Sequence, residues 1–256
     1  MESNNQLQTR TSAEPMQIMK DRQDAFILAC QQANELQLAD NVSSVFMAAD
    51  IVGKLRALLT KEMVDHFFMP LMGTRVGFLT DKDKEDKTGK KPEPYSWETV
   101  RDCIIDAACM GLAPVKNQFN IISGSMYPTK EGFTVLLKKI GVKYIITTSC
   151  DRSQPNSPIA DIECIVRYET PEKPGDLKKF TYVAYPKKNA FSSLDQLKGK
   201  AERKAKKALY ELITGIDLGD ADEDSSTPDV QPNIQDRKEA LRQKNAAGTA
   251  ENPTLM

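Results

Sequence analysis

Residues Lys178–Ile213 read KKFTYVAYPKKNAFSSLDQLKGKAERKAKKALYELI, and they decide the fold because they join an aromatic-bearing strand to a strongly basic helix. Ser193 and Gln196 form an S-x-x-Q capping box, and Gly215 is a stop signal, so the pattern predicts a helix from Ser193 to about Ile213. The expected apolar stripe has the spacing of one helix face and consists of Leu194, Leu197, Ala201, Ala205, Ala208, Leu209 and Leu212.

Positive charge is concentrated in this segment, although the whole chain has a net charge of −1. Between Lys178 and Tyr210, two acids (Asp195 and Glu202) stand against ten bases: Lys178, Lys179, Lys187, Lys188, Lys198, Lys200, Arg203, Lys204, Lys206 and Lys207. Like charges three or four residues apart on a helix repel each other by about 0.2–0.5 kcal/mol per pair. The predicted helix accepts this cost along Lys200, Arg203, Lys204 and Lys207, and a polyanion would relieve it.

Aromatic residues lie among these lysines at positions Phe180, Tyr182, Tyr185 and Phe191. Cations that meet phosphates and rings that meet bases are what a groove for single-stranded nucleic acid requires. The competing interpretation is a solvated charged face, which is the usual role of a charge run. The combination of charge and rings favours nucleic acid.

Length and composition indicate one large domain with loose ends, because 256 residues with 40% hydrophobic content can bury a sizeable core. The chain has no apolar run near 18 residues and no basic-then-apolar leader. We therefore expect a protein that neither spans a membrane nor carries a secretory signal, and that resides in the cytoplasm.

The cysteines and the single histidine argue against metal and acid–base chemistry. The five cysteines (Cys30, Cys103, Cys109, Cys150 and Cys164) form no C-x-x-C pair, so we expect reduced, buried thiols and no zinc site. His66 lies among Val64, Phe67 and Phe68, where we expect a partly buried helix residue. The sequence therefore predicts no catalytic residue, no metal and no cofactor, and a protein that is not an enzyme.

The first half of the chain is predicted to be helical around one loop. Residues 1–20 are polar, and we expect disorder there until a partner or a neighbouring subunit orders them. The apolar spacing predicts helices at Asp24–Leu38 and Ser44–Leu59. Thr60 caps a third helix, Lys61–Met69, which Pro70 ends. A loop follows at Gly73–Tyr95, and Ser96 then caps a helix through Cys109, which Gly111 ends.

The second half alternates between strands and helices. The run Leu112–Ile122, followed by the turn Ser123–Ser125, predicts a hairpin with Met126 and Tyr127. Thr129 caps a helix over Lys130–Ile140, which Gly141 ends. Alternation then predicts three strands, with Tyr144, Ile146, Thr148 and Cys150 on one face of the first, Ala160, Ile162, Cys164, Val166 and Tyr168 on one face of the second, and Phe180–Tyr185 as the third.

The expected fold class is α+β: N-terminal helices, a central helix, a short antiparallel three-stranded meander, a long basic helix, and a flexible acidic C-terminal tail. We divide the chain into an N-terminal arm and helix at 1–44 with a role in assembly, a core at 45–218, and a disordered tail at 219–256 that offers partner docking. Acidic residues between Asp217 and Asp229 follow the basic helix directly, so the tail is also a candidate competitor for its lysines.

Two motifs resemble the phage recombinases of the RecT and Redβ type. The first is the run Ala108-Cys109-Met110-Gly111-Leu112-Ala113-Pro114, similar to a helix ending in Gly-Leu-x-Pro before a strand, followed by Lys130-Glu131-Gly132-Phe133, where a glycine and a bulky residue open a short helix. The second is Ala201–Leu209, similar to the Lys/Ala-rich helix that closes the core of those proteins. The resemblance covers about residues 45–218. The chain departs from the family's pattern at Asn120–Ile122, where an aromatic is frequent, and at Lys130-Glu131.

This resemblance implies an ATP-independent single-strand annealing protein for DNA recombination and repair. It implies binding of single-stranded DNA and of the annealed duplex, assembly into a homo-oligomeric ring or helical filament, and a location in the bacterial host cell. It also implies two protein partners, a phage exonuclease and the host single-stranded-DNA-binding protein.

The predicted DNA-binding residues fall into two groups, and phosphate contacts carry no sequence information, as annealing of arbitrary strands requires. The first group is Lys178, Lys179, Lys187, Lys188, Lys198, Lys200, Arg203, Lys204 and Lys207. The second group is Lys116, Asn117, Gln118, Lys130, Lys138 and Lys139. The base-stacking candidates are Phe119, Tyr127, Tyr182 and Tyr185.

Other functions remain open at this point. ATP-driven strand exchange requires a phosphate cradle, and Thr88-Gly89-Lys90 lacks the first glycine of that motif. A metal-dependent nuclease could use Asp161 and Glu163, which share a strand face; the alternative is a solvated pair with Arg167 as its partner. A plain DNA- or RNA-binding protein without annealing activity would share every basic residue.

Overall fold

The computed structural model describes residues 13–36, 42–83, 89–189 and 192–218, and the fold is α+β, as predicted. The described residues belong to one compact unit, Met1–Asp220. The predicted acidic tail at 219–256 and Phe191 lie outside the described residues.

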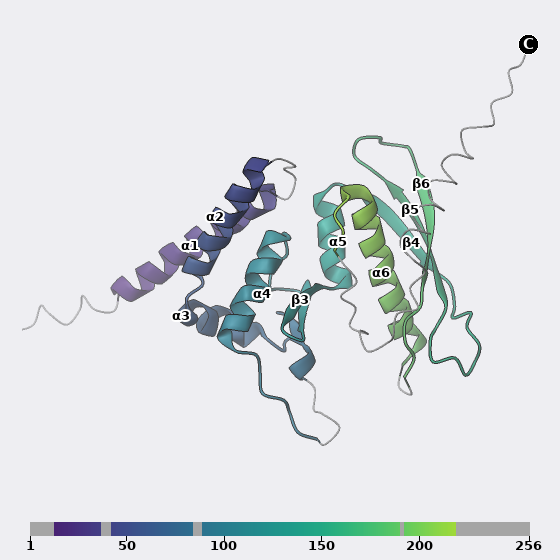
Figure 1. The fold of residues 1–256 in the computed structure, drawn as a ribbon, viewed down its shortest axis with the longest axis horizontal. Coiled ribbons are helices and arrows are strands. Elements are labelled where there is room, and N and C mark those ends of the chain that lie inside the picture. Colours follow the sequence, from purple (N-terminus) through teal and green to yellow (C-terminus); the bar gives the residue numbers. More distant parts are fainter. Residues whose placement is uncertain (1–12, 37–41, 84–88, 190–191, 219–256) are drawn as a thin grey trace, which may run out of the picture. The chain divides into compact units, whose positions relative to one another are not determined.

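Three helices form the N-terminal part of this unit: α1 (Ala13–Leu36), α2 (Val42–Leu58) and α4 (Trp97–Cys109). Each contacts the other two, and Figure 1 shows α1 and α2 running side by side. The prediction of disorder up to residue 20 was wrong, because α1 already begins at Ala13. Polar residues hid the helix, which is held by Phe26 packed edge-on against Phe68 with ring centroids 5.9 Å apart.

The segment after α2 changes winding twice. A short α3 (Lys61–Met63) leads into a π-helical turn η1 (Val64–Phe68) and a 3-10 turn η2 (Met69–Leu71), where one helix was predicted. The Thr60 cap is confirmed, since its side chain accepts a hydrogen bond from the Met63 amide. His66 is exposed rather than partly buried, because Val64 and Phe68 occupy the inner side of the turn.

A small sheet follows, formed by β1 (Leu79–Thr80), β2 (Phe119–Ile122) and β3 (Ser125–Pro128). The predicted hairpin of β2 and β3 is confirmed. The segment 73–95 was predicted to be a loop, but it contains β1, which pairs in parallel with β2, and a 3-10 turn η3 (Asp81–Asp83). A two-residue strand carries no periodicity, so the sequence could not reveal it.

The central helix α4 and the following helix α5 (Lys130–Lys139) begin at the predicted caps. Ser96 accepts from the Thr99 amide and Thr129 accepts from the Gly132 amide. A Cβ atom at Gly132 would lie 2.0 Å from the Gln118 carbonyl oxygen, so α5 can approach the start of β2 this closely only with glycine at that position.

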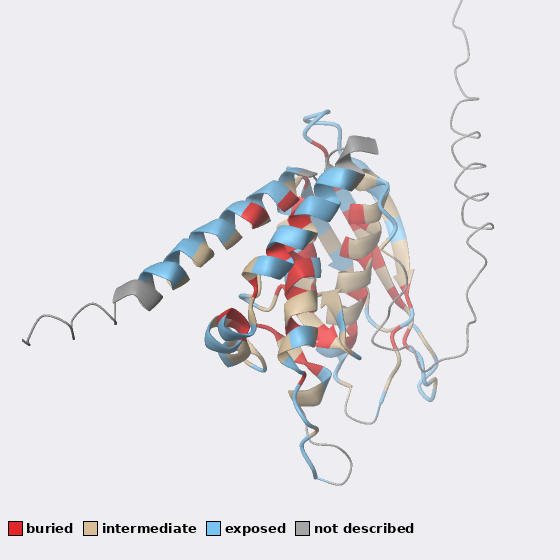
Figure 2. Ribbon diagram, turned by 60° about the vertical axis from the view of Figure 1, so that its left-hand side comes forward, coloured by how far each residue is buried: buried red, intermediate tan, exposed pale blue. Residues whose placement is uncertain are grey.

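The second sheet is the predicted antiparallel meander of β4 (Lys143–Thr148), β5 (Ile162–Glu169) and β6 (Lys178–Ala184). Alternate residues of β5, from Ile162 to Tyr168, are buried. They lie under α6 (Leu194–Thr214), which contacts all three strands and α5. Figure 1 shows α5 and α6 on the same side of this sheet, and Figure 2 shows the buried residues gathered between the helices and the strands.

Helix α6 has the predicted capping box of Ser193 and Gln196, and Gly215 ends it in the left-handed conformation with φ of 72°. The predicted apolar stripe was wrong at both ends, where Leu194 and Leu212 are 41% and 52% exposed. Buried Leu197, Ala201, Ala205 and Leu209 form its centre, together with Lys206 and Tyr210, which the stripe had omitted.

The prediction of buried thiols holds for Cys103 and Cys164 only. Cys30 and Cys109 are half-buried, and Cys150 is exposed because β4 ends at Thr148 and no longer directs its side chain toward the core. None of the described helices combines the length and the apolar content that crossing a lipid bilayer requires.

Candidate nucleic-acid interface

Four of the predicted DNA-binding residues share one side of α6, which we call the α6 cation face: Lys200, Arg203, Lys204 and Lys207. At 100° per residue they fall on the arc opposite the buried side chains, and all four are partly exposed. Each already takes part in at least one polar, ring or electrostatic contact, such as the 3.6 Å ion pair of Lys207 with Glu211. A phosphate bound here would share or replace those contacts.

Lys198 does not belong to this face. Helix geometry places it on the packed side of α6, next to Leu197, where it is partly exposed. Lys130 lies on α5 and reaches α6 through an ion pair with Glu202 (3.4 Å), so the structure brings it close to the helix but directs it toward an acid.

Sequence reasoning missed that Lys206 is buried at 5% exposure. Its Nζ donates to Glu202 Oε1 and to Thr134 Oγ1, both at 2.9 Å, and lies 5.6 Å from the centroid of the Tyr144 ring. Burial raises the pKa of Glu202, but hydrogen bonds and charge from Lys206 and Lys130 outweigh burial and hold that pKa below its ordinary value. Lys206 therefore ties α6 to α5 and β4 and is not a surface cation.

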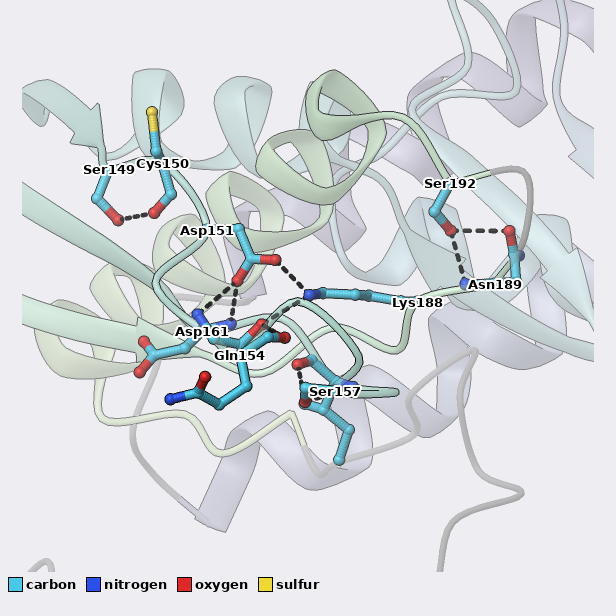
Figure 3. Close-up of polar contacts among 11 residues, drawn as sticks. Ser149, Cys150, Asp151, Gln154, Ser157, Asp161, Lys188, Asn189 and Ser192 are labelled. Carbon is cyan, nitrogen blue, oxygen red and sulfur yellow. Dashed lines mark hydrogen bonds and ion pairs between the residues drawn. The ribbon is translucent and has the colours of Figure 1, made fainter.

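A polar cluster holds the chain soon after β6 (Figure 3), and we call it the Asp151 cluster. Asp151 Oδ1 accepts from the amides of Ser153 (3.0 Å) and Asp161 (2.9 Å), while its Oδ2 pairs with Lys188 Nζ at 2.6 Å. Lys188 also donates to Ser153 Oγ at 2.6 Å. The Lys188 hydrogen bond, followed by the two amides, holds the pKa of Asp151 far below its usual range.

The Asp151 cluster joins the β4–β5 loop to the segment between β6 and α6. Backbone bonds reinforce it, from the Lys188 amide to the Pro158 carbonyl (2.7 Å) and from the Ala160 amide to the Pro186 carbonyl (2.9 Å). Lys187 is partly exposed and its backbone bridges to Ile159. Lys188 is committed to Asp151, so we correct its predicted role from a phosphate contact to an anchor.

Lys178 and Lys179 are exposed at the start of β6, on opposite faces of the sheet. Lys178 pairs in register with buried Tyr168 and so lies on the side that carries α6, whereas Lys179 pairs with exposed Arg167 on the outer face. The strand and helix lysines were predicted to line one groove. The alternation of β6 leaves Lys178 on the side of α6 and places Lys179 on the outer face, because adjacent strand residues point to opposite faces.

The second predicted group is spread over other elements. Lys116 is exposed, and it and Asn117 adopt positive φ angles of 56° and 52° in the turn before β2. Gln118 is buried, and its side chain accepts from the Ala113 amide at 3.0 Å. Phe119 is fully buried and stacks on Phe78 with ring centroids 5.1 Å apart, so its predicted role as a base-stacking residue is wrong.

Lys138 and Lys139 at the end of α5 are both exposed overall, but the Lys139 amine is hydrogen-bonded within the protein. Lys139 Nζ donates to the Gly111 carbonyl at the end of α4 and to Asn34 Oδ1 of α1 at 3.1 Å. Burial lowers the pKa of Lys139 despite the opposing effect of nearby Cys30. We therefore assign Lys139 to holding α1, α4 and α5 together.

The remaining stacking candidates differ in access. Tyr185 is 57% exposed just after β6, and Tyr127 is partly exposed on β3. Tyr182 pairs in register with buried Cys164, so it lies on the side of the sheet that carries α6 and packs against the core. Of the set, Tyr185 presents the most accessible ring.

Asp161 and Glu163, the candidate metal ligands, share one cation. Arg152 pairs with Asp161 at 2.9 Å and with Glu163 at 2.7 Å, so the partner is Arg152 and not Arg167 as predicted. Register explains the error, since Arg167 lies between Ile145 and Lys179 on neighbouring strands. No three His, Cys, Asp or Glu side chains in the described ranges lie close enough together to hold a metal ion.

No protein-family model, curated protein or solved structure matches this chain.

Proposed function

We propose that the protein binds single-stranded DNA through its phosphates and anneals complementary strands without ATP. The observation that carries the proposal is the α6 cation face, where Lys200, Arg203, Lys204 and Lys207 lie together on one side of the helix. Lys206 holds this helix to α5 and β4, and the Asp151 cluster holds the segment that precedes it.

A row of cations on one helix face suits annealing for a physical reason. Contacts to phosphate position a strand without reading its sequence. A strand held by its backbone keeps its bases available for pairing, and the exposed ring of Tyr185, just after β6, is a candidate for sequence-tolerant stacking. Pairing with a second strand then needs no chemical step from the protein.

The proposal includes self-assembly into a ring or filament, which large exposed side chains on α2 support: Phe46 is 74% exposed and Met47 is 54% exposed. Apolar side chains of this size are usually covered by a partner when they cluster. An exonuclease partner and a host single-stranded-DNA-binding partner rest on the resemblance to RecT and Redβ alone. A cytoplasmic location is proposed from the sequence composition as well as from that resemblance.

The salt dependence of binding tests the proposal. The logarithm of the affinity for a single strand should fall with the logarithm of salt concentration by about 0.7 per neutralised phosphate. In the Lys204→Ala/Lys207→Ala variant we expect a slope shallower by about 1.4, for two lost phosphate contacts. The control is Lys20→Gln/Lys173→Gln, which removes the same charge from exposed positions outside the α6 cation face. An unchanged slope in the α6 variant would remove this face from the binding site.

A further inference from the structure

On the outer face of the β4–β5–β6 sheet, opposite α6, two basic side chains lie directly beside each other. Register places Ile145, Arg167 and Lys179 in one row across the three strands, and all three side chains are exposed. Directly opposite residues of antiparallel strands have Cα atoms about 4.5–5.5 Å apart. Arg167 and Lys179 are therefore like charges held side by side by the backbone.

The acids of this face do not neutralise that pair. Glu169 is paired with Lys143 at 3.8 Å, and Glu163 is paired with Arg152 at 2.7 Å. Within the described part of the chain, Arg167 and Lys179 form no ion pair with any acid. Like charges directly opposite each other destabilise a sheet, so this arrangement carries a cost that a bound anion would remove.

The surroundings of the pair fit an extended, flexible anion. The neighbouring row is Thr147, Ile165 and Thr181, in which the two threonines are exposed and hydroxyl-bearing. Ile145, 68% exposed, adjoins Arg167 on the other side and offers an apolar contact. Guanidinium binds phosphate through two parallel hydrogen bonds, and hydroxyl groups are common secondary phosphate ligands.

We propose that this outer sheet face, centred on Arg167 and Lys179, is a second binding surface for the phosphate backbone of a nucleic-acid strand. The inference rests on the proposed function and extends it. The α6 cation face and the outer sheet face lie on opposite sides of the same three strands, so one protein molecule contacts DNA at two separate places. The two sets of contacts act independently.

The test is single-strand binding of Arg167→Thr/Lys179→Thr as a function of salt, measured by anisotropy of a labelled oligothymidylate. Threonine suits a strand, and removing the repulsion should leave the melting temperature equal to or above that of the wild type. Relative to the wild type, the plot of log affinity against log salt concentration should have a slope shallower by about 1.4. When this change is combined with Lys204→Ala/Lys207→Ala, the slope should be shallower by about 2.8. The charge-matched control is again Lys20→Gln/Lys173→Gln.

The outcomes separate the two proposals. If the wild type binds DNA and the sheet variant has the slope of the control, the second surface is refuted and the proposed function stands. If the wild type does not bind DNA, both fail. A third outcome is that the sheet variant binds DNA like the wild type, and that ending the chain at Leu218 changes the melting temperature of the wild type but not of the sheet variant. The pair then binds an acidic protein segment, and the inference is overturned.

Discussion

Replacing Lys206 by methionine separates a structural lysine from the DNA-binding lysines of the same helix. Methionine keeps most of the volume of the side chain and removes its charge. The change deletes the hydrogen bonds to Glu202 and Thr134 and the contact with the Tyr144 ring. Thr134 keeps its own bond to the Lys130 carbonyl at 2.9 Å, so that hydroxyl does not lose all its partners.

The cost follows from what Glu202 retains. Leaving a buried charge without any partner costs about 3–5 kcal/mol. The Glu202 side chain is 31% exposed and keeps Lys130 at 3.4 Å, so water and a second cation compensate in part. A single charge-assisted hydrogen bond contributes about 1.5–3 kcal/mol, and we expect a loss near the lower part of that range, about 2 kcal/mol. For a unit of this size the loss corresponds to a melting temperature about 4–8 °C lower.

The pH dependence has a defined sign. The pKa of Glu202 is lower in the folded protein than its ordinary value of 4.5, so the ion pair stabilises the fold above that value and the contribution is lost as the pH falls through the folded pKa. The difference in the free energy of unfolding between Lys206→Met and the wild type should therefore narrow as the pH drops below 4.5.

Denaturant unfolding followed by circular dichroism measures the loss, with Lys198→Met as the control because Lys198 is partly exposed on the same helix. Lys206→Met should unfold at a clearly lower denaturant concentration than the control. While folded, it should show the same dependence of single-stranded-DNA affinity on salt concentration as the wild type. A variant as stable as the control but with a shallower slope would make Lys206 a DNA contact and refute the reasoning.

Three further predictions address the rest of the chain. Asp161→Asn/Glu163→Gln should leave annealing largely intact, because both carboxylates are bound to Arg152; metal-dependent loss of a DNA strand that this double change abolishes would support the nuclease interpretation instead. Asp151→Asn should have a lower melting temperature at neutral pH than the exposed control Glu172→Gln. This difference in melting temperature should close as the pH falls below 3.8, because the folded pKa of Asp151 lies below that ordinary value. A difference that is constant with pH would contradict the role of the Lys188 pair. A chain that ends at Leu218 should bind short oligonucleotides more tightly at low salt if residues 219–256 compete for the basic surface, with the gain shrinking as salt screens both contacts, whereas equal affinity across the salt range would reject competition.

Elements with strong local signals could be predicted from the sequence. The caps at Thr60, Ser96, Thr129 and Ser193 and the alternation of β5 each depend on residues close together in the chain, and each was confirmed. β1 could not be found, because its two residues gain their structure only by pairing with a strand about 40 positions away. The start of α1 was missed because its first turns are polar and carry no apolar periodicity; Gln17, Ile18 and Lys20 are exposed in the helix.

The candidate site was predictable in part. The α6 cation face follows from helical spacing alone. The same spacing contained the signal for the burial of Lys206, which was missed, since Ala205, Leu209 and Tyr210 surround it on the helix. The pairing of Lys188 with Asp151 and the row of Arg167 with Lys179 depend on loop path and strand register. Neither contact depends on residues nearby in the sequence. The sequence prediction therefore could not distinguish lysines that anchor the fold from lysines that are exposed to a ligand at the surface.

The most direct test of the central claim is the rate at which two complementary oligonucleotides anneal in the presence of the protein, in EDTA and without nucleotide. We predict acceleration over the protein-free reaction, and a smaller acceleration with Lys204→Ala/Lys207→Ala than with the charge-matched control Lys20→Gln/Lys173→Gln. An annealing rate equal to that of the protein-free reaction, at protein concentrations that saturate the single strands, would contradict the account and leave a DNA-binding protein without annealing activity.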